Sequence, residues 1–405
     1  MKLVMLRPSY SPENSAGNHL AIDLVEDFQK NGIEVEMIVS VSAKFKGLPE
    51  GYKDNCKVHR IQSKFAGQGL LTRMLRYIDE SYRMYRKLVS LKDCDVIMTH
   101  STPPTLPPLC ILAAKLMKKP LLYWEQDVVS ESILTTGIAK AKLQKKILYH
   151  IARIIEYISR KGSTHTITIS EKFKQYHIDS GFNDSKVSVI YNWIDTDRIY
   201  PISREENKLF DELGLDRNKF YVTYCGNLGV PQNVEIMIDA AKALSDYPNI
   251  QFIIIGGGSR EKIIHDYIKR KKLKNLVIFP LFPLTRACEV YNLGNIGLVI
   301  GKKGTSNNGF PSKTWTIMSA GQTMISCFDI DSELSEFVRR GNCGIAIEPD
   351  SPEKLKEAIL QIYNSADKGA KYGENAHKFV LEGFSRKQST MKFIDILNIM
   401  YKEIN

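Results

Sequence analysis

The stretch QFIIIGGGSRE, residues 251–261, decides the fold class of this 405-residue chain. Three consecutive isoleucines predict a buried strand, and the glycines and polar turn that follow predict the start of a helix. Backbone amides of Gly256, Gly257 and Gly258, the helix dipole and the Arg260 cation suit a bound diphosphate. Glu261 stands at the third glycine position of G-x-G-x-x-G, which disfavours a dinucleotide fingerprint. A plain glycine-rich turn is the alternative.

Similar apolar runs alternate with helical periods along nearly the whole chain, the pattern of βαβ units around parallel sheets. The chain is therefore predicted to be an α/β protein with two doubly wound, Rossmann-like domains, whose ligands bind outside the carboxyl ends of the strands. In the first half, strands are expected at 2–6, 34–40, 94–100, 121–126 and 164–170. In the second half, further strands are expected at 220–229, 275–280, 296–301, 323–328 and 344–349.

The stretch around 187–206 is interpreted as a strand followed by a polar, proline-containing linker, which sets the domain boundary. We expect one domain over 1–198 and a second over 199–385. The last helix, 386–405, has an apolar face and is expected to pack back on the first domain. Two such domains that face each other would form a cleft, so candidate chemistry is sought in the loops after the strands.

The composition is that of a folded protein: 43% hydrophobic and 25% charged residues, with a net charge of +11. Residues 1–200 carry 29 Lys and Arg against 21 Asp and Glu, which favours an anionic partner for this half, with ordinary solubilising charge as the alternative. The seven cysteines are scattered singly, as expected of free thiols in a reducing compartment. Residues 1–6 are too short an apolar run for a signal peptide, so a cytoplasmic protein is predicted.

Three loops after predicted strands contain residues suited to anions or catalysis. Residues 7–19 place Gly17 just before a helix, and residues 301–315 combine Lys302 with Lys313 among glycines. Both loops suit a phosphate-bearing ligand, although a tight turn and a solvated loop are the alternatives. Residues 123–132 bring Glu125, Asp127 and Glu131 to a strand end, where a carboxylate can act as a base, or merely cap a helix.

Residues 70–92 and 139–162 are basic and amphipathic. Each suits a helix lying on an anionic membrane, and each equally suits a helix packed on a sheet with its charges in water. The first reading predicts a peripheral protein on the inner face of the cell membrane. Nucleic-acid binding is disfavoured because aromatic platforms are not interleaved with the basic stretches. Three D-x-D pairs, at 93–95, 195–197 and 329–331, are interpreted as loop or cap residues.

Taken together, these motifs resemble the family 4 glycosyltransferases of the GT-B fold, in particular bacterial enzymes of O-antigen, capsule and exopolysaccharide synthesis. The resemblance covers nearly the whole chain and rests on order and spacing. The segments that carry it are RPSYSPENSAGNH, YWEQDVVSESI, CGNLGVPQNVEIMIDAAKAL, FIIIGGG and GFPSKTWTIMSAGQ. It implies an acceptor-binding first domain, a second domain that binds a nucleotide sugar, and a last helix that crosses back.

The resemblance also implies site residues. It places Gly17 near the donor phosphates, Asp127 beside the transferred sugar, and residues 256–258 in the loop after the second donor-domain strand. Residues 279–282, including Phe279 and Leu281, match the segment that contacts the base. The loop under the diphosphate is matched by three residues: Pro311, Ser312 and Lys313.

Several positions depart from the family pattern. The two glutamates of the E-x7-E motif align with Asn308 and Thr316, and the usual Arg and Lys after the first strand of the second domain align with Asn227 and Gln232. Related enzymes with the pattern G-N-x-G-x-x-Q also lack that basic pair. Charge neutralisation would then fall to four other cations, namely Arg260, Lys302, Lys303 and Lys313.

The expected activity is a retaining hexosyl transfer from a nucleoside diphosphate sugar, with UDP-hexose or UDP-N-acetylhexosamine favoured, to a lipid-linked or saccharide acceptor. Asp127, Lys313 and Arg260 are the expected catalytic residues, and neither a metal ion nor a cofactor is expected. A UDP-sugar 2-epimerase with the same fold is the enzymatic alternative. A catalytically silent subunit that binds a sugar nucleotide is the alternative from another class, suggested by Asn308 and Thr316.

Overall fold

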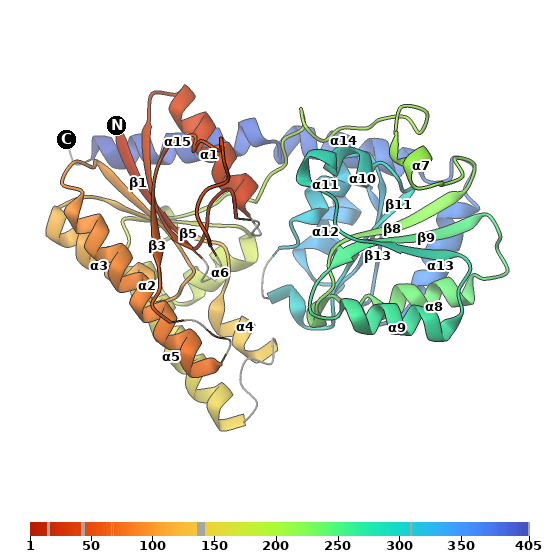
Figure 1. Cartoon of the computed structure of the whole chain (residues 1–405), viewed down its shortest axis with the longest axis horizontal. Helices are drawn as coiled ribbons and strands as arrows, with labels where there is room; N and C mark the ends of the chain where they lie inside the picture. Colours follow the sequence, from red (N-terminus) through yellow and green to blue (C-terminus); the bar gives the residue numbers. More distant parts are fainter. Residues whose placement is uncertain are drawn as a thin grey trace. The chain divides into compact units, whose positions relative to one another are not determined.

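The computed structural model describes residues 1–13, 17–41, 45–65, 67, 69–135, 142–307 and 310–403. The chain divides into two compact units, each built around one parallel sheet (Figure 1). Unit 1 comprises 1–192 and 387–405, and unit 2 comprises 193–386. The last helix therefore belongs with the amino-terminal part of the chain.

Unit 1 has a seven-stranded sheet in the order β3-β2-β1-β4-β5-β6-β7, all parallel. Met5 of β1 lies opposite Met37 on one side and Met98 on the other. The strands are β1 (Lys2–Arg7), β2 (Glu34–Val41), β3 (Lys57–Gln62), β4 (Val96–His100), β5 (Leu121–Glu125), β6 (His165–Thr168) and β7 (Val187–Val189). Strand β3 was not predicted, because its KVHRIQ sequence has no apolar run and its side chains are only half-buried.

The helices of unit 1 connect these strands and cover the sheet. They are α1 (Asn18–Lys30), α2 (Leu70–Ser90), α3 (Leu106–Met117), α4 (Val129–Thr135), α5 (Lys142–Gly162), α6 (Glu171–Asp179), the short 3-10 turn η1 (Asp184–Lys186) and the terminal α15 (Arg386–Lys402). Helix α15 packs on this unit through Phe393, whose ring lies 5.4 Å from that of Trp124, and through Thr390, which donates to Asp27. The predicted return of the last helix is confirmed.

Unit 2 has a six-stranded parallel sheet in the order β10-β9-β8-β11-β12-β13. Its strands are β8 (Phe220–Asn227), β9 (Ile250–Gly257), β10 (Leu276–Phe279), β11 (Ile296–Ile300), β12 (Thr323–Cys327) and β13 (Gly344–Ile347). The predicted strand QFIIIGGG is β9, buried from Phe252 to Gly256. The order of strands reverses between β8 and β11, and such a switch point is where doubly wound sheets bind ligands.

The remaining elements of unit 2 connect and cover this sheet. The helices are α7 (Leu209–Glu212), α8 (Glu235–Ala243), α9 (Glu261–Lys271), α10 (Ala287–Tyr291), α11 (Lys313–Ser319), α12 (Glu333–Arg340), α13 (Pro352–Tyr363) and α14 (Ala370–Gly383). Short 3-10 turns are η2 (Val230–Gln232), η3 (Leu284–Arg286) and η4 (Thr305–Asn307). No helix in the described ranges is both long and apolar enough to cross a membrane.

Candidate active site

The loops after β8 and β9 in unit 2 run against each other. Gly226 pairs with Gly256 across the two strands, and a Cβ on Gly256 would lie 2.6 Å from the Gly226 carbonyl oxygen. Gly258 has φ of 151°, and a Cβ there would lie 2.4 Å from Asn227 Oδ1. Only glycine permits this approach. The glycines thus present backbone at the carboxyl edge of the sheet, as the sequence predicted.

Lys313 is the first residue of α11 and reaches this edge. Its Nζ atom lies 3.8 Å from the ring centroid of Tyr224, a cation–π contact, and is shielded from solvent. A Cβ on Gly226, whose φ is 136°, would lie 3.0 Å from Nζ, so the glycine makes room for the lysine. Burial lowers the pKa of Lys313 to about 8.

Three buried polar atoms, from α11 and from the turn η2 after β8, lack hydrogen-bond partners within the described chain. They are Lys313 Nζ, Thr314 Oγ1 and Gln232 Oε1. A buried polar atom without a partner costs free energy, and native structures retain few of them. Lys313 Nζ lies beside Gly226 near the end of β8, next to the switch point, so its lack of a partner indicates that an anionic ligand completes the site.

The other predicted cations differ from Lys313. The Arg260 guanidinium forms an ion pair with Glu235 of α8, and its backbone N–H donates to the Leu228 carbonyl at 2.9 Å. Its charge is thus already balanced within unit 2. Lys302 is half-buried and is anchored by its backbone N–H, which donates to the Pro231 carbonyl at 2.8 Å.

Acidic residues hold the basic loop that contains Lys302. The Asp329 carboxylate accepts the N–H groups of Gly304 at 2.9 Å and Ser306 at 3.2 Å. Asp350 accepts the N–H of Lys303 at 3.2 Å. The interpretation of the D-x-D pair at 329–331 as loop-forming residues is therefore confirmed for Asp329.

The other residues predicted to bind the donor are half-buried or exposed, where the structure describes them. Phe279 is half-buried against the core, and Leu281 is exposed. Asn227 is also exposed, and its backbone carbonyl accepts a hydrogen bond from the Tyr224 hydroxyl at 2.7 Å. On the α11 side, Pro311 and Thr316 are half-buried and Ser312 is exposed. Asn308 lies outside the described residues.

Asp127 follows β5 in unit 1 and is exposed. Its backbone N–H and that of Gln126 both donate to Ser101 Oγ, at 3.3 and 3.2 Å. Partial desolvation by the surrounding protein and then the charge of Glu125 raise the pKa of its carboxyl. A carboxyl so placed is suited to contact a hydroxyl or a developing positive charge.

Glu125 is the last residue of β5, but its predicted role as a candidate base at this strand end is wrong. Glu125 is fully buried and accepts hydrogen bonds from Arg160 at 2.7 Å and from His177 at 2.6 Å. It binds helices α5 and α6 to the sheet instead of facing the loop. Glu131 lies in the first turn of α4 and is half-buried.

Comparisons with known proteins agree with this geometry. A model described as "Glycosyltransferase Family 4" matches residues 17–198, and one described as "Glycosyl transferases group 1" matches residues 205–379. Together they span both units. The chain belongs to glycosyltransferase family 4.

Individual relatives of this glycosyltransferase are distant in sequence. WcaI of Escherichia coli K12, which is assigned to colanic acid biosynthesis, is 27% identical over 62% of the chain and 61% of its own length. The chain thus spans about three fifths of that relative. An Escherichia coli UDP-Gal:alpha-D-GlcNAc-diphosphoundecaprenol alpha-1,3-galactosyltransferase is 26% identical over 42% of the chain and 43% of its own length.

Solved structures establish the fold of the glycosyltransferase. Anabaena HepE, solved with UDP, superimposes with a TM-score of 0.75 at 17% identity, over 98% of this chain and 100% of its own. WaaG, from lipopolysaccharide biosynthesis, gives 0.72 at 13% identity, over 97% and 99%. The predicted GT-B fold, with two doubly wound domains, is confirmed.

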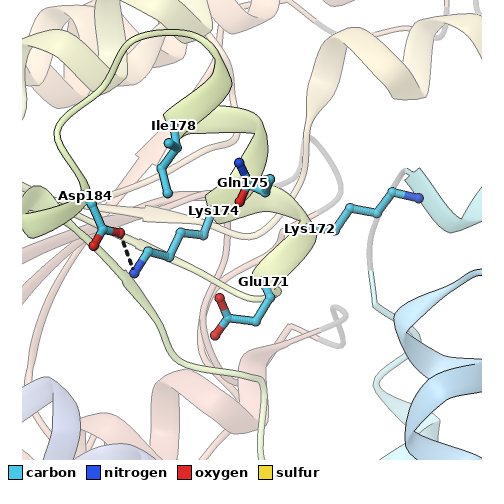
Figure 2. A pocket seen from close by; sticks show the side chains of 6 residues that line it. All are labelled: Glu171, Lys172, Lys174, Gln175, Ile178 and Asp184. Carbon is cyan, nitrogen blue, oxygen red and sulfur yellow. Dashed lines mark ion pairs between the residues drawn. The ribbon is translucent and has the colours of Figure 1, made fainter.

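Two hollows in the surface of the glycosyltransferase lie apart from the residues named above. One, of about 540 Å³, is lined by residues of α6 and by Asp184, which forms an ion pair with Lys174 at 2.7 Å (Figure 2). The other, of about 620 Å³, lies on α9 beside Ile263 and Asp266. Neither is lined by a residue predicted to bind the donor.

Sequence reasoning missed the aromatic partner of Lys313. Tyr224 was predicted only to lie in a strand, and the sequence of a strand does not show which distant side chain packs on its ring. The glycine two residues later, with its positive φ, is a usable signal for a close approach from another element.

Proposed function

We propose that this glycosyltransferase moves a hexose or an N-acetylhexosamine from a UDP-sugar to a lipid-linked or saccharide acceptor in bacterial surface polysaccharide synthesis. We further propose that transfer retains the anomeric configuration and needs neither a metal ion nor a cofactor. The observation that carries the proposal is Lys313, a buried ammonium without an ionic partner in the described part of the chain. HepE, with its bound UDP, and the galactosyltransferase relative support the choice of donor.

The transfer reaction requires the protein to stabilise two developing charges. Cleavage of the bond from sugar to diphosphate builds negative charge on the leaving diphosphate and positive charge on the sugar. Lys313 and the backbone amides around Gly256 and Gly258 stabilise the negative charge on the leaving diphosphate. Asp127, whose pKa is raised by desolvation, stabilises the positive charge on the sugar or orients the acceptor hydroxyl.

A binding screen tests the donor assignment. UDP is expected to raise the melting temperature more than GDP, TDP or CMP, because a ligand at 100 times its Kd stabilises the folded state by about 2.7 kcal/mol. Release of UDP from a UDP-sugar should then require an acceptor, and NMR of the product should show the donor's anomeric configuration. Conversion of the UDP-sugar into its 2-epimer without an acceptor and without net release of UDP would favour the epimerase, and binding without turnover would favour a silent subunit.

We also propose that unit 1 lies on an anionic membrane through α2 and α5. In both helices the face toward the sheet is partly polar, with Glu80 buried in α2 and Glu156 and Arg160 buried in α5, while the apolar stripe faces outward. The exposed apolar side chains are Leu71, Met74, Leu75, Ile78 and Tyr82 on α2, and Leu143, Ile147, Ile151, Ile154, Tyr157 and Ile158 on α5.

A helix that packs on a sheet normally does so through its apolar face, whereas the apolar stripes of α2 and α5 face outward. Lysines and arginines flank these stripes. Exposed apolar stripes with basic flanks suit the interface of anionic lipids.

The membrane assignment predicts cosedimentation with vesicles that contain phosphatidylglycerol, and little with purely zwitterionic vesicles. Introducing charge with the pair Ile147→Glu and Ile154→Glu should reduce the bound fraction at least about tenfold, since charges are costly at the interface. Ile263→Glu, on the exposed face of α9 in unit 2, is the matched control and should bind normally. Equal binding by all three proteins would contradict the assignment, and self-association lost in the double variant would indicate an interface between copies.

A further inference from the structure

The segment that presents Asp127 is held on both sides by one helix, α5. Before Asp127 in the chain, Glu125 accepts hydrogen bonds from Arg160 Nε at 3.0 Å and Nη2 at 2.7 Å. After it, Glu156 accepts the backbone N–H and the hydroxyl of Ser130, each at 2.8 Å. Glu156 and Arg160 lie one turn apart on the same face of α5. The loop between these two contacts is therefore fixed at both ends.

Asp127 is the exposed part of this segment. The structure describes all of 125–130, and Glu125 and Ser130 are buried whereas Asp127 is exposed. The Asp127 carboxylate forms no hydrogen bond within the described ranges, so its position is set by the backbone that carries it. This backbone is irregular, because β5 ends at Glu125 and α4 begins at Val129. Its conformation thus depends on hydrogen bonds to side chains and not on a helix or a sheet.

Two further contacts hold the same loop from the sheet. The buried hydroxyl of Ser101, the residue after β4, accepts the backbone N–H groups of Gln126 and Asp127 at 3.2 and 3.3 Å. The side-chain amides of Gln126 and Asn192 donate to each other, both at 2.9 Å. The contacts with α5 hold the loop from the helix layer. The loop thus has support from both layers of unit 1.

Glu156 is a costly residue for a place where only packing is needed. It is 4% exposed, and among the described residues both hydrogen bonds of its carboxylate come from Ser130. Burial raises the pKa of this carboxyl, and the Ser130 N–H and the Arg160 charge oppose the rise only in part. An apolar side chain would fill the space between α4 and α5 at lower cost. What the carboxylate provides instead is a fixed position for Ser130, three residues after Asp127.

We propose that Glu156 is a positioning residue, which acts through Ser130 to hold Asp127 where it contacts the substrate. The inference rests on the proposed function, in which the Asp127 carboxyl contacts the sugar or the acceptor hydroxyl. A displacement of about 1 Å in such a group can lower the rate about 100-fold. Loss of the contact between Ser130 and Glu156 should therefore lower kcat. Donor binding, which is assigned to unit 2, should stay unchanged.

Three variants and a control isolate this contact. Ser130→Ala removes one of its two hydrogen bonds, Glu156→Leu removes both, and Glu156→Gln keeps an acceptor oxygen. Ser63→Ala is the matched control, because the Ser63 hydroxyl donates to Asp79 of α2 in the same unit at 3.0 Å. Ser130→Ala is the smallest change, and it carries the test if Glu156→Leu does not fold.

Hydrogen exchange of the full chain, followed by mass spectrometry, tests the contact without any substrate. In Ser130→Ala, the peptide that covers 125–130 is expected to exchange at least about tenfold faster, since its local opening becomes easier. Peptides of β1 should keep the wild-type rate, and Ser63→Ala should leave the 125–130 peptide unchanged. Glu156→Gln should lie between the wild type and Glu156→Leu. Wild-type exchange of 125–130 in Ser130→Ala refutes the inference, as does an equal acceleration throughout unit 1.

Turnover separates positioning from stability. With UDP-galactose as donor and N-acetylglucosaminyl-diphosphofarnesol as acceptor, Ser130→Ala should lower kcat about 10- to 100-fold and leave the KM for the donor unchanged. In an Asp127→Asn background it should cause no further loss, because the group that it positions is gone. The same loss in both backgrounds would contradict the inference. No turnover by the wild type would contradict this choice of donor and acceptor, and the exchange result then decides the inference by itself.

Discussion

Lys313→Met should abolish most of the transferase activity while leaving the fold intact. The substitution keeps the length of the side chain and removes the only charge on it. A group that stabilises charge in the transition state of a shielded site typically contributes a factor of about 10²–10³ to kcat. We expect kcat to fall by that factor and the Kd for UDP to rise about 10- to 100-fold.

The same variant should be at least as stable as the wild type without ligand. Burial lowers the pKa of Lys313 to about 8, which means that the folded protein disfavours the charged form. Methionine removes this cost and can still pack on the ring of Tyr224. The free energy of unfolding, measured with urea, should therefore rise by about 1 kcal/mol. Lys378→Met, an exposed lysine on α14 of the same unit, is the control for both measurements.

The pH dependence of UDP binding adds an independent readout. Below pH 8 the lysine of the free protein is protonated, and affinity should be constant. Above pH 8 the free protein loses this proton, and binding of the diphosphate must restore it, so the Kd should rise up to tenfold per pH unit. Lys313→Arg should move this loss of affinity to a higher pH. A pH-independent Kd between pH 7 and 9.5, with full activity of Lys313→Met, would remove Lys313 from the site.

Much of the fold could be predicted from the sequence because buried parallel strands are short continuous apolar runs. Strands such as IGLVI at 296–300 and TMISC at 323–327 need no tertiary information to be recognised. Glycine loops after these strands could be placed for the same reason, since carboxyl ends of parallel strands share one edge of the sheet. The edge strand β3 lacks an apolar run and could not be recognised in this way.

The partners of charged side chains could not be predicted, because they come from segments far apart in the chain. Arg260 was expected to be a free cation, but its partner Glu235 lies on the preceding helix. Lys313 has the same formal charge and instead lies against an aromatic ring. The hydrophobic period of α5 was read correctly, yet the period alone does not say whether that stripe faces the sheet or solvent.

Glu125→Ala should destabilise unit 1 more than any surface substitution. Arg160 and His177 both donate to this carboxylate, at 2.7 and 2.6 Å, and both are buried. Removing one partner of a buried charge pair typically costs about 3–5 kcal/mol, since the remaining charge stays uncompensated. Urea unfolding at pH 7, followed by tryptophan fluorescence, should show a loss of that size. Glu125→Gln, which keeps an acceptor oxygen, should lose less, and the exposed Glu50→Gln should lose nothing.

Acid should remove the same stabilisation from the wild type. Burial alone would raise the pKa of Glu125, but Arg160 and His177 outweigh it and lower the pKa to about 2. Because this value lies below the ordinary 4.5, the contribution is complete above pH 4.5 and is lost as the pH falls toward 2. Wild type and Glu125→Gln should therefore differ most in stability near pH 7 and converge near pH 2. A constant difference across this range would show that the carboxylate is not the charged partner of Arg160.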